Sequence, residues 1–264
     1  MSARVLVVVP TYNEKESIPG ALARLAEHVP EADVLVVDDG SPDGTGQLVE
    51  QIAADERDAG VSRSVSVLHR TAKLGLGAAY VAGFGWALER GYDVVVEMDA
   101  DGSHRAQDLP ALLSAVPDAD LVLGSRWVPG GSVVNWPKNR ELLSRGANTY
   151  TRLLLGIPVR DATGGFRAYR ADLLRSLPLG DVASRGYCFQ IDMTLRSLAA
   201  GARVIEVPIT FVERELGASK MSRDIVVEAL VKVTRWGIAE RSRQLAGAFS
   251  TKSHTGRQDR PVGR

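Results

Sequence analysis

The sequence has little cysteine, little histidine and no excess charge of either sign. Its 264 residues include one Cys, four His and equal numbers of basic and acidic residues, 32 of each. The single Cys188 excludes a disulfide within the chain and is typical of a reducing compartment. Cysteine and histidine are too few and too scattered for a zinc site. Net neutrality argues against non-specific nucleic-acid binding, so we expect no nucleic-acid partner.

Long apolar segments are also lacking. The longest uncharged stretch, 74–88, is rich in glycine. It is shorter than the ~20 residues that a membrane-spanning helix needs. The first residues lead into a short apolar run that stops at Pro10, which does not resemble a signal peptide. We therefore expect a chain that does not cross a membrane by itself and that resides in the cytoplasm.

Apolar runs of strand length alternate with segments that have helical spacing. The expected strands are short, rich in valine and leucine, and cover 5–9, 34–37, 65–68, 94–98 and 121–123. Continuous apolar runs of this kind indicate strands buried on both faces of a parallel sheet. Helical segments at 17–28, 77–90 and 107–116 lie between them. This alternation predicts an α/β protein with a doubly wound, mostly parallel sheet flanked by helices.

The second half of the chain follows a different pattern. Its expected elements are helices at 139–155 and 189–200 and short strands at 166–169 and 204–207. A C-terminal amphipathic helix is expected at 221–249, and a disordered polar tail at 250–264. We therefore expect one domain over 1–220, with halves at about 1–125 and 126–220, followed by the helix and the tail.

Polar residues follow three of the expected strands. They are PTYNE at 10–14, DDGS at 38–41 and DAD at 99–101. Since parallel strands end at the same edge of a sheet, we expect these loops to lie along one rim. A solvated turn would explain any single one of these acidic groups. Several of them on one rim require something positive among them.

Asp99 and Asp101 have the spacing that suits a hard divalent cation. In an extended segment, residues two apart point the same way, so both carboxylates can reach one ion directly or through its waters. Mg²⁺ accepts one or two protein carboxylates and takes diphosphate oxygens as further ligands. The glycines at 75, 77 and 83 do not form a dinucleotide fingerprint, because they follow the third strand and have the wrong spacing. No P-loop motif is present in the sequence.

Nine sequence segments occur in an order that is typical of one enzyme family. Three of them follow strands, namely PTYNE, VDDGSPDGT and MDAD. The others are GSR at 124–126, RELLSRGAN at 140–148, DATGGFR at 161–167, GYCFQ at 186–190, EVPITFVER at 206–214 and GASK at 217–220. The first three segments resemble the family 2 glycosyltransferases of the GT-A fold. Together with the other six, over about residues 4–235, they resemble the polyprenol-phosphate (dolichol-phosphate) mannose synthases of that family.

The resemblance implies an inverting transfer of mannose from GDP-mannose to a polyprenyl monophosphate. It assigns donor contacts in the nucleotide half to Pro10, Tyr12, Glu14, Val37, Asp39 and Ala100. Asp99 and Asp101 would be catalytic and would face both the diphosphate and Mg²⁺ or Mn²⁺. Ser103 stands where some relatives have a glutamine ligand, so it is the third expected metal contact. Gly102 stands where leucine is common, and we expect this difference to be harmless.

Basic residues of the acceptor half would hold anions. The acceptor phosphate has a second pKa of about 6 and is mostly ionised near neutrality. It therefore needs positioning rather than a general base. By resemblance Arg126, Arg140 and Ser144 bind this phosphate, and both arginines count as catalytic. Arg214 and Lys220 would close over the donor diphosphate. Guanidinium groups match phosphate geometry, and lysine acts as a point charge.

A polyprenyl phosphate resides in a bilayer, so we expect a peripheral protein at the inner face of the cell membrane. The 221–249 helix, which includes Trp236, lies either in the interface or on the sheet. Residues 240–264 contain six basic and two acidic residues, a balance that anionic lipid would attract. Some relatives associate with a membrane-embedded acyltransferase, so a membrane-embedded protein partner is a further expectation.

Two alternatives stay open at the level of sequence. The first is transfer of glucose or another sugar from a UDP donor to the same lipid, because guanine and uracil share the acidic rim contact. The second is a non-catalytic nucleotide-binding module, which would keep Asp39 but have no use for Arg126, Arg140 and Lys220. A panel of labelled sugar nucleotides, tested with membranes and a chelator, separates the three hypotheses.

Overall fold

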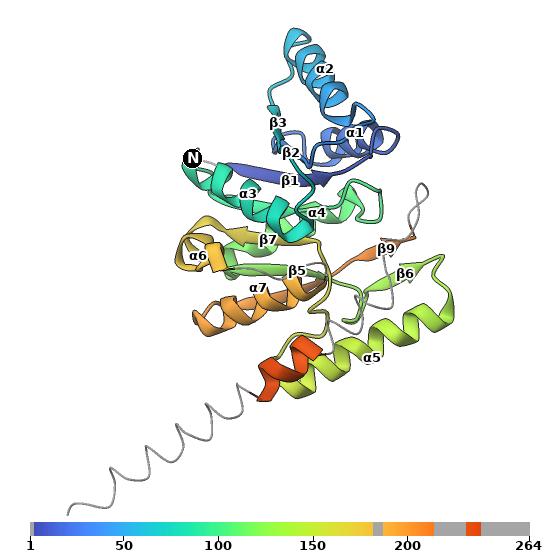
Figure 1. Ribbon diagram of the computed structural model, residues 1–264, viewed down its shortest axis with the longest axis vertical. Helices are drawn as coiled ribbons and strands as arrows, with labels where there is room; N and C mark the ends of the chain where they lie inside the picture. The colour runs from blue at the N-terminus through green and yellow to red at the C-terminus, as the bar shows by residue number, and fades with distance from the viewer. Residues whose placement is uncertain (1–2, 182–186, 214–230, 239–264) are drawn as a thin grey trace, which may run out of the picture.

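The computed structural model describes residues 3–181, 187–213 and 231–238 and is built around one seven-stranded sheet (Figure 1). The strand order is β3-β2-β1-β4-β7-β5-β8. The first four positions are parallel strands, namely β1 (Val5–Thr11), β2 (Asp33–Asp38), β3 (Val65–His69) and β4 (Val94–Glu97). The doubly wound, mostly parallel sheet predicted from the sequence is therefore confirmed.

The remaining strands introduce one reversal. β7 (Arg167–Arg170) runs antiparallel to both of its neighbours, β4 and β5 (Leu121–Ser125). β5 then pairs in parallel with β8 (Val204–Pro208). Two strands that the sequence did not predict, β6 (Ser132–Val134) and β9 (Thr210–Val212), form a separate pair. They are short and only half buried, so they lack the continuous apolar pattern of the central strands.

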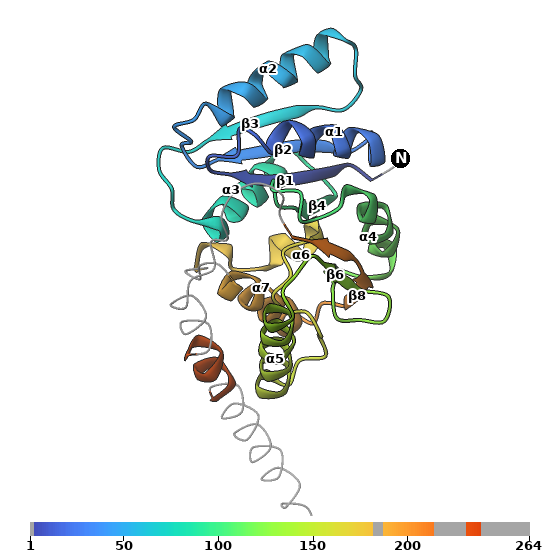
Figure 2. The same cartoon turned by 90° about the vertical axis from the view of Figure 1, so that its right-hand side faces the viewer.

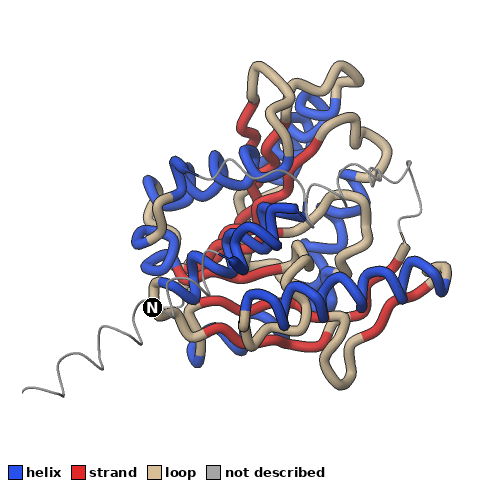
Figure 3. The backbone as a smooth tube through the Cα atoms, turned by 60° about the horizontal axis from the view of Figure 1, so that its bottom comes forward, coloured by secondary structure: helices blue, strands red, loops and turns tan. Residues whose placement is uncertain are grey.

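Helices cover both faces of the sheet, as Figures 2 and 3 show. One face packs against α1 (Ile18–His28), α2 (Thr45–Asp58) and α4 (Leu109–Ala115). The other packs against α3 (Leu76–Glu89), α6 (Ala171–Ser176) and α7 (Tyr187–Ala199). Alternate residues of β1 enter opposite cores, with Leu6 and Val8 on one face and Val7 and Val9 on the other. This two-sided burial explains why the strand is apolar throughout.

The long helix α5 (Lys138–Leu155) lies beside the 231–238 segment at one end of the molecule (Figure 1). This segment is helical, as predicted, and its Val233 is buried in the core. Tyr150 of α5 and Thr234 share a hydrogen bond of 2.8 Å between their hydroxyl oxygens. The rest of the predicted 221–249 helix and the 250–264 tail lie outside the described residues. Within the part of the chain that the structure describes, no helix has the length and apolar content of a membrane span.

Candidate active site

The carboxyl ends of β1, β2 and β4 lie together because these strands are parallel neighbours. Thr11 Oγ1 at the end of β1 donates to Asp38 Oδ1 at the end of β2, at 3.1 Å. The amide of Asp39 donates to the carbonyl of Thr11 at 3.0 Å, and the amide of Met98 donates to that of Val8 at 3.2 Å. The structure thus brings the PTYNE, DDGS and DAD loops to one rim, as predicted.

Several of the donor residues expected from the sequence lie at the β1–β2 part of this rim. Pro10 and Val37 are opposite each other in the strand register. The amide of Glu14 donates to Thr45 Oγ1 at 3.1 Å, and its carboxylate accepts a 2.8 Å bond from Ser17 Oγ at the start of α1. These contacts hold the PTYNE loop against the N-terminal ends of α1 and α2.

Two basic residues from the loop after β3 reach the same rim. Arg70 Nη1 donates to Asp39 Oδ1 at 2.7 Å, and both side chains are largely buried. Lys73 Nζ lies 3.8 Å from the centre of the Tyr12 ring. Neither residue was predicted from the sequence, although both lie in the loop directly after β3. They supply some of the positive charge that the acidic rim requires.

The DAD loop is held from both sides. Tyr80 of α3, which is fully buried, donates from its hydroxyl to Asp99 Oδ1 at 3.3 Å. The amide of Ser103 donates to Asp101 Oδ1 at 3.0 Å. Gly102 lies between them with φ 78°, a left-handed conformation in which a leucine would be strained. The glycine that replaces the common leucine therefore suits this turn.

His104 fixes the backbone of the same loop. The amide of Asp99 donates to its Nδ1 at 3.0 Å, and the imidazole stacks on Phe166 with ring centres 5.1 Å apart. Burial lowers the pKa of His104, which outweighs the opposing effect of Asp99 and Asp101. The imidazole is therefore neutral and serves as an acceptor that positions Asp99. This role of His104 was not predicted from the sequence.

The residues of the DAD loop fit a divalent cation. Asp99 and Asp101 offer two carboxylates, and Ser103 Oγ is buried with no hydrogen-bond partner among the described residues. Among the described residues, no three or more His, Cys, Asp or Glu side chains are grouped so that they could hold a metal ion by themselves. A cation here would take two carboxylates from the protein and its other oxygens from hydroxyl, water or substrate. That donor set is the one Mg²⁺ prefers.

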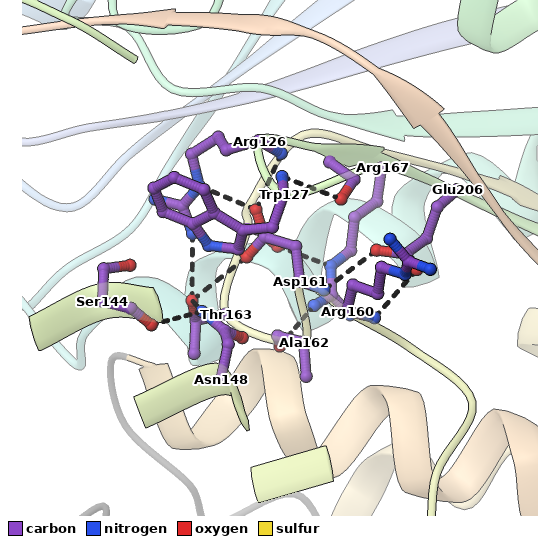
Figure 4. A network of polar contacts seen from close by, with 12 residues as sticks. Arg126, Trp127, Ser144, Asn148, Arg160, Asp161, Ala162, Thr163, Arg167 and Glu206 are labelled. Atoms are coloured by element: carbon purple, nitrogen blue, oxygen red, sulfur yellow. Dashed lines mark hydrogen bonds and ion pairs between the residues drawn. The ribbon is translucent and has the colours of Figure 1, made fainter. Parts of the chain in front are cut away.

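Arg126, at the end of β5, forms a buried fork with Asp161 (Figure 4). Its Nε and Nη2 donate to the two carboxylate oxygens at 2.7 Å each, and its amide donates at 3.0 Å. Burial acts to raise the pKa of Asp161, but the charge and hydrogen bonds of Arg126 hold it below its usual range. Nε and Nη2 are thus already engaged by other residues of the protein. The direct contact of Arg126 with the acceptor phosphate stays a prediction.

The fork is linked to α5 and to β8 (Figure 4). Thr163 Oγ1 accepts from Arg126 Nη2 and from Asn148 Nδ2 of α5, at 3.0 Å each. Asn148 Nδ2 also donates to the carbonyl of Ser144 at 3.0 Å. The carboxylate of Glu206 accepts the amides of residues 160 and 161 at 2.8 and 2.9 Å. The predicted acceptor residues Arg126 and Ser144 thus belong to one connected network.

Arg140, on the first turn of α5, has a different environment. Its Nη1 donates to the carboxylate of Glu213, which directly follows β9. Its guanidinium carbon lies 4.1 Å from the centre of the Trp136 ring, and its Nε is buried without a hydrogen-bond partner among the described residues. Glu213 lies in the EVPITFVER segment at 206–214, but the resemblance assigned it no role. Arg214 and Lys220, the predicted donor-loop residues, lie outside the described residues.

Aromatic contacts join the acceptor side to the DAD loop. Phe211 of β9 packs edge-on against His104, with ring centres 5.4 Å apart. It also packs against Trp136 at the same distance. The guanidinium carbon of Arg126 lies 5.4 Å from the Phe211 ring centre. The paired carboxylates and the arginines are therefore parts of one continuous site.

The chain is similar in sequence to known glycosyltransferases. Residues 6–177 match glycosyl transferase family 2. An undecaprenyl-phosphate mannosyltransferase of Micrococcus luteus is 60% identical over 238 residues, which cover 90% of this chain and 96% of that protein. A polyprenol monophosphomannose synthase of Mycolicibacterium smegmatis is 54% identical over 245 residues, which cover 92% of this chain and 91% of that protein.

Solved structures share the fold at lower sequence identity. Glucosyl-3-phosphoglycerate synthase from Mycobacterium tuberculosis, crystallised with Mn²⁺, UDP-glucose and phosphoglyceric acid, matches with a TM-score of 0.61. It is 21% identical, and the match covers 88% of this chain and 80% of that one. The family match and the two close relatives extend over most of the chain. The chain therefore belongs to glycosyl transferase family 2, among its polyprenol-phosphate mannose synthases.

Proposed function

We propose that the chain transfers mannose from GDP-mannose to a polyprenyl monophosphate with inversion at the sugar carbon. The names of the two close relatives support the sugar and the lipid class. The observation that carries the proposal is the continuity between the paired carboxylates of the DAD loop and the arginines around Phe211. One site then has a place for a nucleotide diphosphate and a place for an anionic acceptor.

The nucleotide half would bind the donor. Asp39, oriented by Arg70, would accept from the base, and the PTYNE loop would line the nucleoside. Asp99 and Asp101 would hold Mg²⁺ or Mn²⁺, with Ser103 beside them. When bound, the cation would supply Lewis-acid stabilisation to the departing diphosphate. Mn²⁺ accompanies a nucleotide sugar in the M. tuberculosis synthase of the same fold.

The acceptor half would position the lipid phosphate. A phosphate oxygen attacks the sugar carbon from the side opposite the diphosphate, forming the new C–O bond as the bond to GDP breaks. GDP leaves with the electron pair, and the product is a β-linked mannosyl phosphate. The nucleophile is already ionised, so no side chain needs to remove a proton. Arg126, Arg140 and Ser144 would hold it in line, with Arg126 itself fixed by its buried fork with Asp161.

The surface of α5 supports action at a membrane face, which we propose to be the cytoplasmic one. Leu142, Leu143 and Leu153 are 73%, 51% and 64% exposed on a helix that also carries several basic residues. Exposed leucines beside lysine and arginine suit the interface of an anionic bilayer. Replacing Leu142 and Leu143 with glutamate should reduce sedimentation with anionic vesicles. Leu74→Glu, at a site 61% exposed after β3, is the matched control.

Substitutions in the two halves test the reaction. Asp101→Ala should abolish mannosyl transfer from GDP-mannose, because the diphosphate would lose its cation. Arg140→Ala should spare nucleotide binding and impair use of the lipid phosphate. Undiminished turnover of Asp101→Ala, or a pure donor-affinity defect in Arg140→Ala, would contradict these roles. Incubating the wild-type chain with GDP-mannose and UDP-glucose in parallel decides between the proposed donor and the UDP-sugar alternative.

A further inference from the structure

Three arginines gather around Trp127 and Trp136, and each has its own carboxylate. The ion pairs are Arg126–Asp161, Arg140–Glu213 and Arg145–Glu141. The two indole rings are 6.4 Å apart, and each has an arginine over it, Arg145 over Trp127 and Arg140 over Trp136, at 4.2 and 4.1 Å. The cluster is therefore a built arrangement of cations rather than a set of unrelated surface groups.

The three pairs differ in how readily an incoming anion could replace the carboxylate. Asp161 is 0% exposed and receives three hydrogen bonds from Arg126. Arg145 and Glu141 are half and one-third exposed neighbours on one helix. The Arg140 and Glu213 side chains are 18% and 25% exposed, and one guanidinium nitrogen makes their hydrogen bond. Only this pair is both enclosed in the cluster and held by a single contact.

The Arg140 end of the cluster also has more donors than acceptors. Within the described part of the chain, Arg140 Nε and the Nε1 of Trp136, the ring that lies beside the Arg140 guanidinium, are buried without hydrogen-bond partners. Leaving a buried donor without an acceptor is unfavourable. A phosphate monoester has more acceptor oxygens than a carboxylate and binds arginine through the same charge-assisted hydrogen bonds. The donors around Arg140 therefore suit an anion larger than the side chain that it now holds.

We propose that Glu213 occupies the position on Arg140 that the acceptor phosphate takes over, so that Glu213 competes with the acceptor and sets its affinity. This inference rests on the proposed function. The backbone of Glu213 is fixed by a 3.0 Å hydrogen bond from its amide to the carbonyl of Val134. Its carboxylate is thus presented to Arg140 from an anchored strand end. Binding of the acceptor exchanges one ion pair for another and requires no change in covalent bonds.

The test is the Glu213→Gln variant with a water-soluble, short-chain prenyl monophosphate as acceptor and GDP-mannose as donor. Removing the competing charge should lower the acceptor KM roughly two- to five-fold, the range expected for a partly exposed ion pair. The donor KM should not change. Glu141→Gln is the matched control, because it removes the same charge from the neighbouring Arg145 pair. Its acceptor KM should equal that of the wild type.

Two further variants make the result specific. Glu213→Asp keeps the charge on a shorter side chain, so its acceptor KM should lie between those of wild type and Glu213→Gln. In an Arg140→Ala background, Glu213→Gln should have no effect on the acceptor KM, because the competition acts through Arg140. An unchanged or raised acceptor KM in Glu213→Gln, or an equal drop in Glu141→Gln, overturns the inference. Failure of the wild type to use prenyl phosphate would instead refute the proposed function.

Discussion

Replacing Asp161 with asparagine should destabilise the chain far more than its single lost charge would suggest. Asp161 is 0% exposed, and its partner Arg126 is 5% exposed. The substitution leaves a buried guanidinium beside a neutral amide, and breaking a buried ion pair in this way costs about 3–5 kcal/mol. The amide keeps one acceptor oxygen, so we expect the lower end, about 3 kcal/mol. The corresponding drop in Tm is roughly 6–12 °C for a chain of this size.

Thermal and urea denaturation measure this loss, and a second ion pair supplies the control. Asp172 accepts from Arg175 Nη1 at 2.7 Å, the same distance as in the fork, but the two side chains are 80% and 49% exposed. Asp172→Asn should therefore cost less than about 1 kcal/mol. If the two variants lose equal stability, or if Asp161→Asn loses no more than the control, burial does not determine the strength of the fork.

The pH dependence provides an independent check of the same pair. The folded state holds the pKa of Asp161 below its usual range. The stability that the ionised carboxylate of Asp161 contributes is therefore fully present above its unfolded pKa of about 3.9. It is lost as the pH falls through the pKa of the folded state. The difference in unfolding free energy between wild type and Asp161→Asn should be constant near neutrality and shrink below about pH 4. A difference that grows on acidification would contradict this sign.

Three other perturbations have defined outcomes. A Cβ at Gly83 of α3 would lie 2.5 Å from Val8 of β1, whereas one at Gly85 meets nothing within 4 Å. Gly83→Ala should thus lower the free energy of unfolding by about 1–3 kcal/mol. Gly85→Ala should instead raise it, by as much as about 1 kcal/mol. Urea denaturation measures both changes. Arg70→Ala should raise the donor KM and leave the acceptor KM unchanged, because Arg70 orients Asp39. EDTA should abolish transfer, and either Mg²⁺ or Mn²⁺ should restore it; transfer that persists in EDTA would refute the metal role.

The sequence was sufficient for most of the sheet because its strands are buried on both faces. Leu6 and Val8 enter one core and Val7 and Val9 the other, so the whole run is apolar and easily recognised. The reversed direction of β7 could not be predicted, because strand polarity follows from connections that are distant in sequence. α2 was missed for another reason. Only Thr45, Gly46 and Val49 of its residues are buried, which leaves a weak apolar stripe.

The site was predictable where it depends on strand ends and motifs. PTYNE, DDGS and DAD follow parallel neighbours in the sheet, so their meeting at one rim follows from topology alone. The partners of the charged residues were not predictable. Glu213 reaches Arg140 across 73 positions of sequence, and Asp161 reaches Arg126 across 35. Long-range pairing of this kind is set by the packing of α5, β5 and β9, which local patterns do not encode.

The arginines of the acceptor half show why a motif alone does not assign a role. Arg167 ends the DATGGFR segment and is 0% exposed, yet its guanidinium donates to three backbone carbonyls and to Thr194. Arg126 is likewise enclosed by Asp161 and Thr163. In contrast, Arg140 keeps a buried Nε without a partner among the described residues. Satisfied donors stabilise the fold, and among these three arginines we expect an incoming anion to gain most at Arg140, whose Nε lacks an acceptor among the described residues.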